Sequence, residues 1–594
     1  MSLNDSQQTH YNAQQKSIAQ CQNYFYKIGN QNSFDSAATM PDVLPGTLKK
    51  ILEITGLDSA SYIDTGIRAG IAEYQACHGN ELPHPSVLAT ALDAGLAIAN
   101  KVSKMNAAVI ASFDSAQAIN DIDVIAGLDS VSNTQQESVS IVPALTVATI
   151  ANLIAYATPI IAYIPNSNGS NEVPLVAARF VTDQSFGAMA DKDYLDGVNA
   201  AKPYAEGRFR FALDNGGAGA EYTVVARTRY KDFKEKTPDD AAEKLPFVSG
   251  NISIRINGKE VAHTRNRGKS AHEGIISVIA ERAIQIGDKK ISVVGSVIDL
   301  DKRSLTVTLS EELPAGSRIE AALVADFDAR DGKNFALTPV GVSIKPEFET
   351  LVSAPISNQI RASRLVLNQL SNELNLGFVG NAVGIMQGKI YLEQTVRLLS
   401  EGKERAEYNN RTYVFDASRG VTGKLASAFN TTGDLFAELM KTISIAKISI
   451  NQSSGGATSS YDLYVGDAAL VFFDQLNSDN MPKRTGAVAG HGQIVRIGTL
   501  KDGTNVYHVP TSAEVLAEGS TSFEMELIGR GNEPVRNPFV GFIEMPLTVV
   551  EATPDPRETL MGLIGSQAAE LNPLDRYADQ IALITAINMP NLGK

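Results

Sequence analysis

A run without any charged side chain, residues 141–165 (IVPALTVATIANLIAYATPIIAYIP), restricts the possible folds of this chain more than any other segment. About 20 apolar residues are enough to cross a bilayer as a helix. However, Pro143, Pro159 and Pro165 interrupt the run, and no nearby Lys or Arg could set its orientation in a membrane. We therefore interpret it as a helix (ALTVATIANLIAYA), a buried strand (IIAYI) and a turn (PNSNGSNE), which other parts of the protein must cover.

The composition indicates a folded chain with three or more lobes. Its 594 residues exceed the roughly 250–300 that a single hydrophobic core can organise. Hydrophobic residues make up 43% and charged residues 20%, which is typical of globular proteins. The 52 basic residues against 66 acidic residues give a net charge of -14, and this disfavours direct binding to nucleic acid.

The N-terminal region divides into a polar part and a helical part. Residues 1–38 are rich in Gln, Asn and Ser, which predicts an arm that is extended or ordered only by a partner. They contain no apolar segment of the kind that a secretory signal needs. Residues 45–102 have helical periodicity, and three short helices are expected before residue 105. The two cysteines, Cys21 and Cys77, exclude a disulfide framework and favour a reducing cytoplasm.

The block at residues 215–335 predicts an inserted β-sandwich. In NISIRINGKEVAH the isoleucines alternate with Ser253 and Arg255, and Asn257-Gly258 is a strong hairpin signal. RSLTVTLS and RIEAALVADFDA are further strand candidates, and HEGIISVIAERAI is a candidate helix. The glycine-containing segments DNGGAGAE and DARDGKN are interpreted as the hinges of this block.

Two further regions follow the block. The stretch from ISNQIRASRL to KERAEY predicts a helix of about forty residues. After it, a hairpin is expected over Asp502-Gly503.

No group of residues predicts catalysis. Gly268-Lys269-Ser270 ends like a phosphate-binding loop, but the first glycine of that motif is replaced by His263, which leaves a basic, solvated turn as the favoured interpretation. Cys77, His78 and His84 lie close together without a visible fourth metal ligand. The remaining histidine candidates are scattered: His263, His272, His491 and His508. We expect no enzyme activity, no cofactor and no bound metal.

Three ordered segments resemble the major capsid protein of tailed bacteriophages, which has the Hong Kong 97 fold, and especially its T-even-like branch. They are TIANLIAYATPIIAYIPNSNGSNEVPLVAARFV, VSIKPEFETLVSAPISNQIRASRLVLNQL, and NEPVRNPFVGFIEMPLTVVEATPDPRE followed by DRYADQIALITAINMP. The candidate motif residues within them are Asn152, Tyr156, Pro165, Pro174, Arg179, Pro546, Asp555, Pro556 and Arg576.

The resemblance implies an α+β fold with a peripheral domain, a spine helix, an axial domain, an extended loop and an N-terminal arm. It assigns 1–105 to the arm and short helices, 106–181 to the first part of the peripheral domain, 182–345 to the extended loop with its β-rich insertion, 346–403 to the spine helix, 404–540 to the axial domain and 541–594 to the closing strands of the peripheral domain. Residues 141–181, 346–403 and 541–590 should therefore converge on one domain.

The implied function is self-assembly, in the cytoplasm of a bacterial host, into the icosahedral head shell of a virion that encloses double-stranded DNA. Expected partners are copies of the chain in hexamers and pentamers, together with scaffold, portal and decoration proteins. DNA would be near without specific binding, and no membrane is expected. Three alternatives remain open: a vertex or encapsulin-like shell protein of the same fold, a β-sandwich adhesin or tail-fibre protein, and an enzyme that uses the turn at Gly268-Lys269-Ser270.

Overall fold

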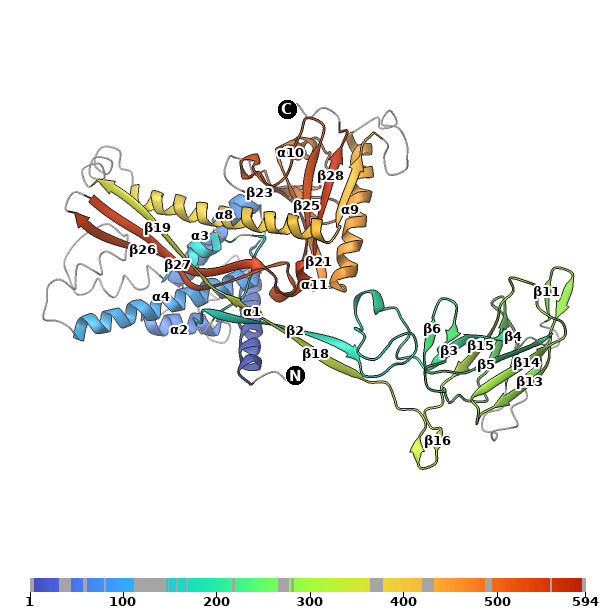
Figure 1. The fold of residues 1–594 in the computed structure, drawn as a ribbon. Helices are drawn as coiled ribbons and strands as arrows, with labels where there is room; N and C mark the ends of the chain where they lie inside the picture. The colour runs from blue at the N-terminus through green and yellow to red at the C-terminus, as the bar shows by residue number, and fades with distance from the viewer. Residues whose placement is uncertain are drawn as a thin grey trace. The chain divides into compact units, whose positions relative to one another are not determined.

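The computed structural model describes most of the chain and divides it into two compact units. The first unit consists of Met1–Ala177 and Pro346–Lys594, and the second unit is Ala178–Lys345. The described residues are 5–30, 44–56, 61–79, 82–111, 146–147, 149–155, 157, 159–166, 169–215, 219–264, 277–278, 283–363, 378–418, 432–486, 494–555 and 558–589. Helices and strands both contribute, so the expected α+β class is confirmed (Figure 1).

The N-terminal part of the first unit is a group of packed helices. They are α1 (Asp5–Asn30), α2 (Gly46–Thr55), α3 (Ser61–His78) and α4 (Pro85–Ala111). The prediction of an extended arm over residues 1–38 is wrong for the residues of α1. Cys21, Tyr24 and Phe25 have helical spacing and are buried in a core shared with α2, α3 and α4. Burial of this stripe stabilises a helix that its polar composition did not suggest.

Three segments far apart in the sequence form one four-stranded sheet. Its order is β1 (Ala162–Tyr163), β26 (Phe539–Asp555), β27 (Glu558–Leu571) and β19 (Ala354–Ser363). β1 runs parallel to β26, and β19 pairs antiparallel with β27 over its whole length. The predicted convergence of the three resembling segments is thus confirmed for these strands.

The spine region contains less helix than predicted. Residues 354–363, whose latter part was expected to be helical, form strand β19, and α8 (Phe378–Tyr408) begins later and ends later than the predicted spine segment 346–403. The backbone of β19 pairs with β27 residue by residue from Ala354 to Ser363. This pairing supplies hydrogen bonds that outweigh a weak helical preference, because tertiary context overrides propensity.

The first unit also contains a seven-stranded sheet. Its order is β20 (Thr412–Asp416), β28 (Ile581–Ile587), β25 (Phe523–Gly531), β21 (Thr458–Val465), β24 (Asn505–His508), β23 (Val495–Thr499) and β22 (Lys483–Arg484). The predicted hairpin over Asp502-Gly503 is confirmed as β23 and β24. β28 was expected among the closing strands of the peripheral domain, but it pairs here with β20 and β25.

The two faces of the seven-stranded sheet are covered differently. α9 (Thr432–Ser454) and α10 (Asp467–Asp474) share an apolar core with one face, which includes Leu463 and Met525. α8 and α3 pack with the other face, where Tyr464 and Tyr507 lie. Because side chains alternate along a strand, residues 463 and 464 point to opposite sides.

The second unit consists of two antiparallel sheets that share one core. The five-stranded sheet has the order β10-β9-β8-β15-β3 and the four-stranded sheet the order β13-β14-β5-β4. Their strands are β3 (Arg208–Ala212), β4 (Asp214–Asn215), β5 (Glu221–Val225), β8 (Ser253–Ile256), β9 (Lys259–His263), β10 (Ser277–Val278), β13 (Val293–Asp299), β14 (Ser304–Leu309) and β15 (Ile319–Val324).

Short hairpins complete the second unit. They are β6 (Tyr230–Asp232) with β7 (Thr237–Pro238), β11 (Ile284–Ile286) with β12 (Lys289–Ile291), and β16 (Arg330–Asp331) with β17 (Asn334–Phe335).

The local predictions in this unit succeed at β8 and β9. Ile252, Ile254 and Ile256 are buried, and the hairpin turns at Asn257 and Gly258, whose φ angles are 49° and 84°. Two consecutive positive φ angles are the signature of the two-residue turn that matches the twist of paired strands. The alternation in RSLTVTLS is likewise confirmed as β14.

Other predictions in this unit are wrong. The helix expected over HEGIISVIAERAI is replaced by strand at Ser277–Val278 and at Ile284, and residues 272–276 and 279–282 lie outside the described residues. The expected hinges lie within the unit, because β4 pairs with β5 and β16 pairs with β17. The chain instead enters and leaves the unit through β2 (Glu172–Thr182) and β18 (Val342–Val352), which pair with each other.

The described residues at the end of the uncharged run, 157 and 159–165, are buried. Residues 149–155 are helical, and Ile160, Ile161 and Ile164 are buried beside β26 and its neighbours. In the part of the chain that the structure describes, no helix is both long enough and apolar enough to span a bilayer.

Candidate functional site

His78, a candidate metal ligand, is a packing residue in the structure. Its buried ring lies with its centroid 4.4 Å from that of Tyr74, at the end of α3. A guanidinium nitrogen of Arg496 donates to the backbone carbonyl of His78 at 3.2 Å. Burial, with a smaller contribution from the charge of Arg496, lowers the pKa of His78 to about 4, so the ring is neutral at pH 7.

His84 has a different environment. The residue is exposed, and its Nδ1 lies 2.7 Å from Ser86 Oγ in the first turn of α4. The side chain of Cys77 lies outside the described residues. Among the residues that are described, no three His, Cys, Asp or Glu side chains gather as metal ligands.

The phosphate-loop candidate and the remaining histidines form no common site. Residues 268–270, His272 and His491 lie outside the described residues. The Nδ1 of His263 on β9 lies 3.0 Å from Glu260 Oε1. His508 on β24 is buried, with its Nε2 2.6 Å from Oδ1 of Asp467 on α10.

The proline motif residues mark the ends and edges of strands. Pro165 is buried after β1, and its carbonyl accepts a hydrogen bond from Gln14 Nε2 at 3.3 Å. Pro174 is half-buried within β2, and Pro546 is buried within β26.

The other motif residues of this group are less informative. Asn152 is exposed on the helical segment 149–155. Tyr156, Pro556 and the side chain of Asp555 lie outside the described residues.

The two motif arginines each make specific contacts. The Arg179 guanidinium in the second unit pairs with Asp196 at 2.6 Å and lies 3.2 Å from the centroid of the Tyr194 ring. In the first unit, Arg576 Nε donates to the carbonyl of Ser454 at 2.6 Å, at the C-terminus of α9. A cation there interacts favourably with the helix dipole. Both arginines therefore stabilise local structure.

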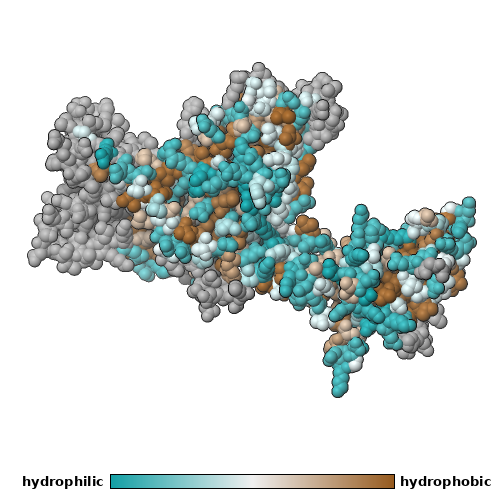
Figure 2. Space-filling view, viewed as in Figure 1, coloured by the Kyte–Doolittle hydropathy of each residue, from teal (hydrophilic) through white to brown (hydrophobic). Residues whose placement is uncertain are grey.

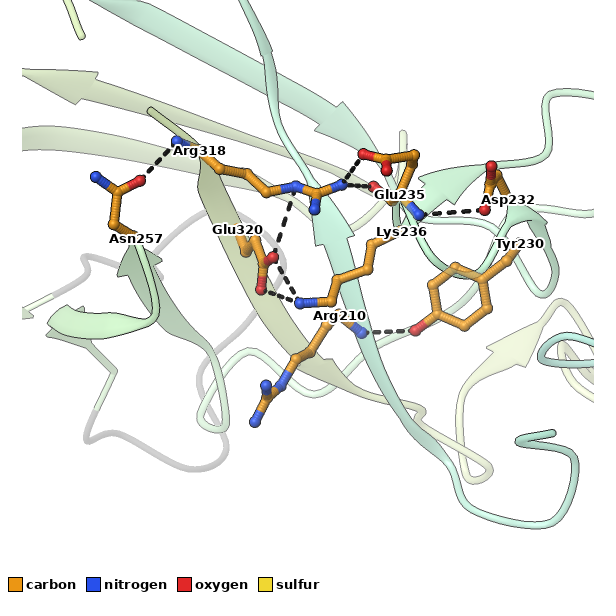
Figure 3. A network of polar contacts seen from close by, with 8 residues as sticks. All are labelled: Arg210, Tyr230, Asp232, Glu235, Lys236, Asn257, Arg318 and Glu320. Atoms are coloured by element: carbon orange, nitrogen blue, oxygen red, sulfur yellow. Dashed lines mark hydrogen bonds and ion pairs between the residues drawn. The ribbon is translucent and has the colours of Figure 1, made fainter. Parts of the chain in front are cut away.

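A polar network on the second unit was not predicted (Figure 3). Glu320 on β15 is only 7% exposed and accepts two hydrogen bonds from Lys236 Nζ, at 2.6 and 2.7 Å. Arg318 lies between this carboxylate and Glu235, at 3.7 Å and 2.7 Å. The partners are more than 80 residues apart in sequence, so no local pattern could have revealed the network.

A second unpredicted network lies in the first unit, on the face of the seven-stranded sheet that packs with α3 and α8. Asp462 on β21 is 1% exposed and pairs with Arg530 at 3.1 Å. Asn505 also donates to Asp462, at 3.1 Å, and accepts from Arg496 at 2.9 Å. Burial raises the pKa of Asp462, and the charge of Arg530 opposes that effect.

The β2–β18 ribbon presents the most exposed apolar side chains near the start and end of the second unit. Phe180, Val342 and Ile344 are 57%, 58% and 60% exposed. Figure 2 shows that apolar residues also reach the surface elsewhere in both units. A two-stranded ribbon is only marginally stable by itself in water, and exposed apolar side chains on one favour contact with another protein surface. This ribbon is our candidate functional surface.

Comparisons with known proteins found similar solved structures. No protein-family model and no curated protein sequence matches the chain. The capsid of the jumbo bacteriophage PhiKZ is similar at 9% identity, over 73% of this chain and 92% of that chain, with a TM-score of 0.34. The capsid of Myoviridae phage XM1 is similar at 11% identity, over 43% and 81%, with a TM-score of 0.27. An encapsulin from Synechococcus elongatus is similar at 12% identity, over 43% and 79%, with a TM-score of 0.25.

Proposed function

We propose that this chain is the major capsid protein of a tailed bacteriophage, which self-assembles into the icosahedral head shell around packaged double-stranded DNA. The proposal places the protein in the virion head, assembled in the cytoplasm of the bacterial host, and gives it a structural role without catalysis. Copies of the chain in hexameric and pentameric capsomers would be its main partners.

The observation that carries the proposal is the composition of the four-stranded sheet. The three segments that resemble the capsid family supply β1, then β19, then β26, and the strand that directly follows the third segment, β27, completes the sheet. They are separated by at least 160 residues at each gap in the sequence. Even so, β1 pairs directly with β26, and β19 joins the same sheet by pairing with β27. A chance resemblance between apolar strands gives no reason for the same three segments to lie in one sheet.

The exposed ribbon supports a role in assembly. In the proposed shell, β2 and β18 belong to the extended loop, and the second unit is the domain inserted into that loop, as in the T-even-like branch. Phe180, Val342 and Ile344 would be covered by a neighbouring copy of the chain. Burial of apolar surface contributes about 25 cal/mol for each Å², so several modest contacts can together hold a closed shell.

Scaffold, portal and decoration proteins are proposed as further partners by analogy with the family alone. The acidic net charge of -14 is compatible with a protein that encloses DNA without binding it tightly.

An encapsulin-like or vertex shell protein of the same fold is the nearest alternative. It would use the same sheet, and it differs in whether hexamers form. A β-sandwich adhesin is disfavoured, since the resembling strands belong to the first unit, outside the sandwich.

The test is assembly of the purified full chain, measured by sedimentation velocity and negative-stain electron microscopy. We expect closed shells containing hexamers, formed by the chain alone or with a scaffold protein from the same phage. Shells built only from pentamers would favour the encapsulin-like alternative. A chain that stays monomeric with all phage assembly factors present would contradict the proposal.

Ile344→Lys tests the ribbon directly. It places a charge on the exposed ribbon, and we expect loss of shells with an unchanged circular dichroism spectrum. The matched control is Val297→Lys on β13, where the wild-type side chain is 65% exposed and lies outside the ribbon. Equal loss of assembly in both variants would remove the ribbon from the mechanism.

A further inference from the structure

The interface between α8 and the seven-stranded sheet contains a buried acid that pairs with no positively charged group among the described residues. Glu526 lies on β25, opposite Tyr464 of β21 and Leu583 of β28. It is 0% exposed, and within the described part of the chain neither of its carboxyl oxygens has a hydrogen-bond partner. The hydroxyl of Tyr464 is also buried without a partner. Such a group is costly in its charged form, because burial removes the water that would stabilise the charge.

The helix α8 lies directly against this carboxyl. A Cβ atom at Gly402 would come within 2.4 Å of Glu526 Oε1 and 2.9 Å of Phe539 Cζ. Glycine at this position therefore lets the helix backbone approach the acid closely. Movement of α8 away from the sheet would be the simplest way to bring water to Glu526.

The charged groups around Glu526 are already engaged. Lys403 of α8 donates to Glu524 Oε2 at 2.7 Å and to the carbonyl of Val515 at 3.2 Å. Two residues further along α8, Arg405 pairs with Asp579 at 2.7 Å and with Asp575 at 2.9 Å.

The strands and the remaining helix that pack here supply no compensation either. Asp462 and Arg530, on β21 and β25, are paired with each other. β28 and β26 face this site with Ile581 and Phe539. Tyr74 and His78 of α3 lie on the same face of the sheet, and neither carries a positive charge at pH 7.

We propose that Glu526 is a proton-dependent latch between α8 and the seven-stranded sheet. With its carboxyl protonated, α8 packs on the sheet as observed. Loss of the proton leaves an uncompensated charge in the interface and favours the state in which α8 has moved away. The inference concerns the packing of the chain itself and does not depend on the proposed function.

The direction of the pH dependence follows from proton linkage. Burial raises the pKa of Glu526 well above its ordinary value, with Lys403 as a weaker opposing influence. The closed state therefore binds the proton more tightly than the open state. Closure is strongest below the ordinary Glu pKa of about 4.3, and weakens as pH rises from there to the pKa of the closed state.

Hydrogen exchange of the full-length chain tests the latch, with the amides of α9 as an internal reference. α9 packs on the other face of the sheet, and the ratio of α8 to α9 protection removes the intrinsic effect of pH on exchange. Between pH ~4.3 and the pKa of Glu526 in the closed state, we expect this ratio to fall in the wild type by about tenfold for each pH unit. In Glu526→Gln, which cannot ionise, the ratio should stay constant within twofold.

Glu401→Gln is the matched control, because Glu401 is a partly exposed carboxylate on the same helix, paired with Arg397 at 2.9 Å. It should keep the wild-type slope. A flat wild-type ratio, or the same slope in Glu526→Gln as in the wild type, would overturn the proposal. Glu526→Met, which is uncharged and of similar size, serves the same purpose if Glu526→Gln does not fold.

Discussion

At the scale of single residues, the buried polar side chains explain why candidate chemistry in the sequence became packing in the structure. His78 looked like a metal ligand because Cys77 and His84 are close in sequence. In the fold its carbonyl accepts from Arg496 and its ring packs beside Tyr74. A buried, neutral imidazole in such a place contributes to packing and stability.

The first prediction concerns this histidine. The folded-state pKa of about 4 is below the ordinary value of 6.5, so the unfolded chain takes up the proton first. Protonation of His78 therefore leaves the free energy of unfolding unchanged above pH 6.5 and lowers it as pH falls from 6.5 towards 4. His78→Phe removes this titration, so the free energy of unfolding of the variant should lack this decrease, which is on the order of 3 kcal/mol at pH 4.

The measurement is the difference in urea unfolding free energy between His78→Phe and the wild type at pH values from 4 to 8. Taking the difference at each pH cancels the titration of all other groups. A difference that does not change between pH 8 and pH 4 would show that the ring is exposed or charged in the folded protein.

At the scale of elements, α8 shows how one helix can carry glycines with opposite consequences. Gly388 has open space where a Cβ would be added, whereas a Cβ at Gly402 would meet Glu526 and Phe539. The first glycine only weakens the helix, because glycine costs about 1 kcal/mol relative to alanine in a helix interior. The second glycine is required by the close approach of α8 to the sheet.

The second prediction is therefore a pair of identical substitutions in one helix. Gly388→Ala should raise the unfolding free energy by about 1 kcal/mol. Gly402→Ala should lower it by roughly 1–3 kcal/mol, because the added methyl group overpacks the interface. Thermal and urea unfolding of the two variants beside the wild type will measure both effects, and a stabilising Gly402→Ala would refute the close approach.

At the scale of the whole molecule, the boundaries of the second unit differ from those that the strand pattern suggested. The β-rich block at 215–335 omits β3, which contributes the buried Phe209 and Phe211 to the shared core. Near the ends of the unit, the backbone nitrogen of Gly341 donates to Asp183 at 2.9 Å. The start and end of the unit thus lie close together, at Ala178 and Lys345 rather than at the expected hinges.

The third prediction follows from these boundaries. A fragment of residues 178–345 should be soluble and β-rich and should unfold cooperatively. A fragment of residues 215–335 should not fold, since it lacks β3 and four buried aromatic residues of the shared core: Phe186, Tyr204, Phe209 and Phe211. Circular dichroism and thermal melts of the two fragments will distinguish them. A cooperative melt of the shorter fragment would show that β3 is dispensable.

Local sequence was sufficient where structure depends on neighbouring residues. The alternation around Ile254, the turn at Asn257 and Gly258, and the strand RSLTVTLS were readable because side-chain alternation and positive φ angles are local properties. The three-part resemblance also identified which distant segments meet. Tertiary structure alone decided that residues 354–363 pair as a strand and that α1 packs as a helix. It also decided that β28 joins the seven-stranded sheet and that the Glu526 carboxyl lies buried beneath α8. In each of these cases the deciding free energy comes from burial or backbone pairing with residues far away in the chain, and no local pattern contains those partners.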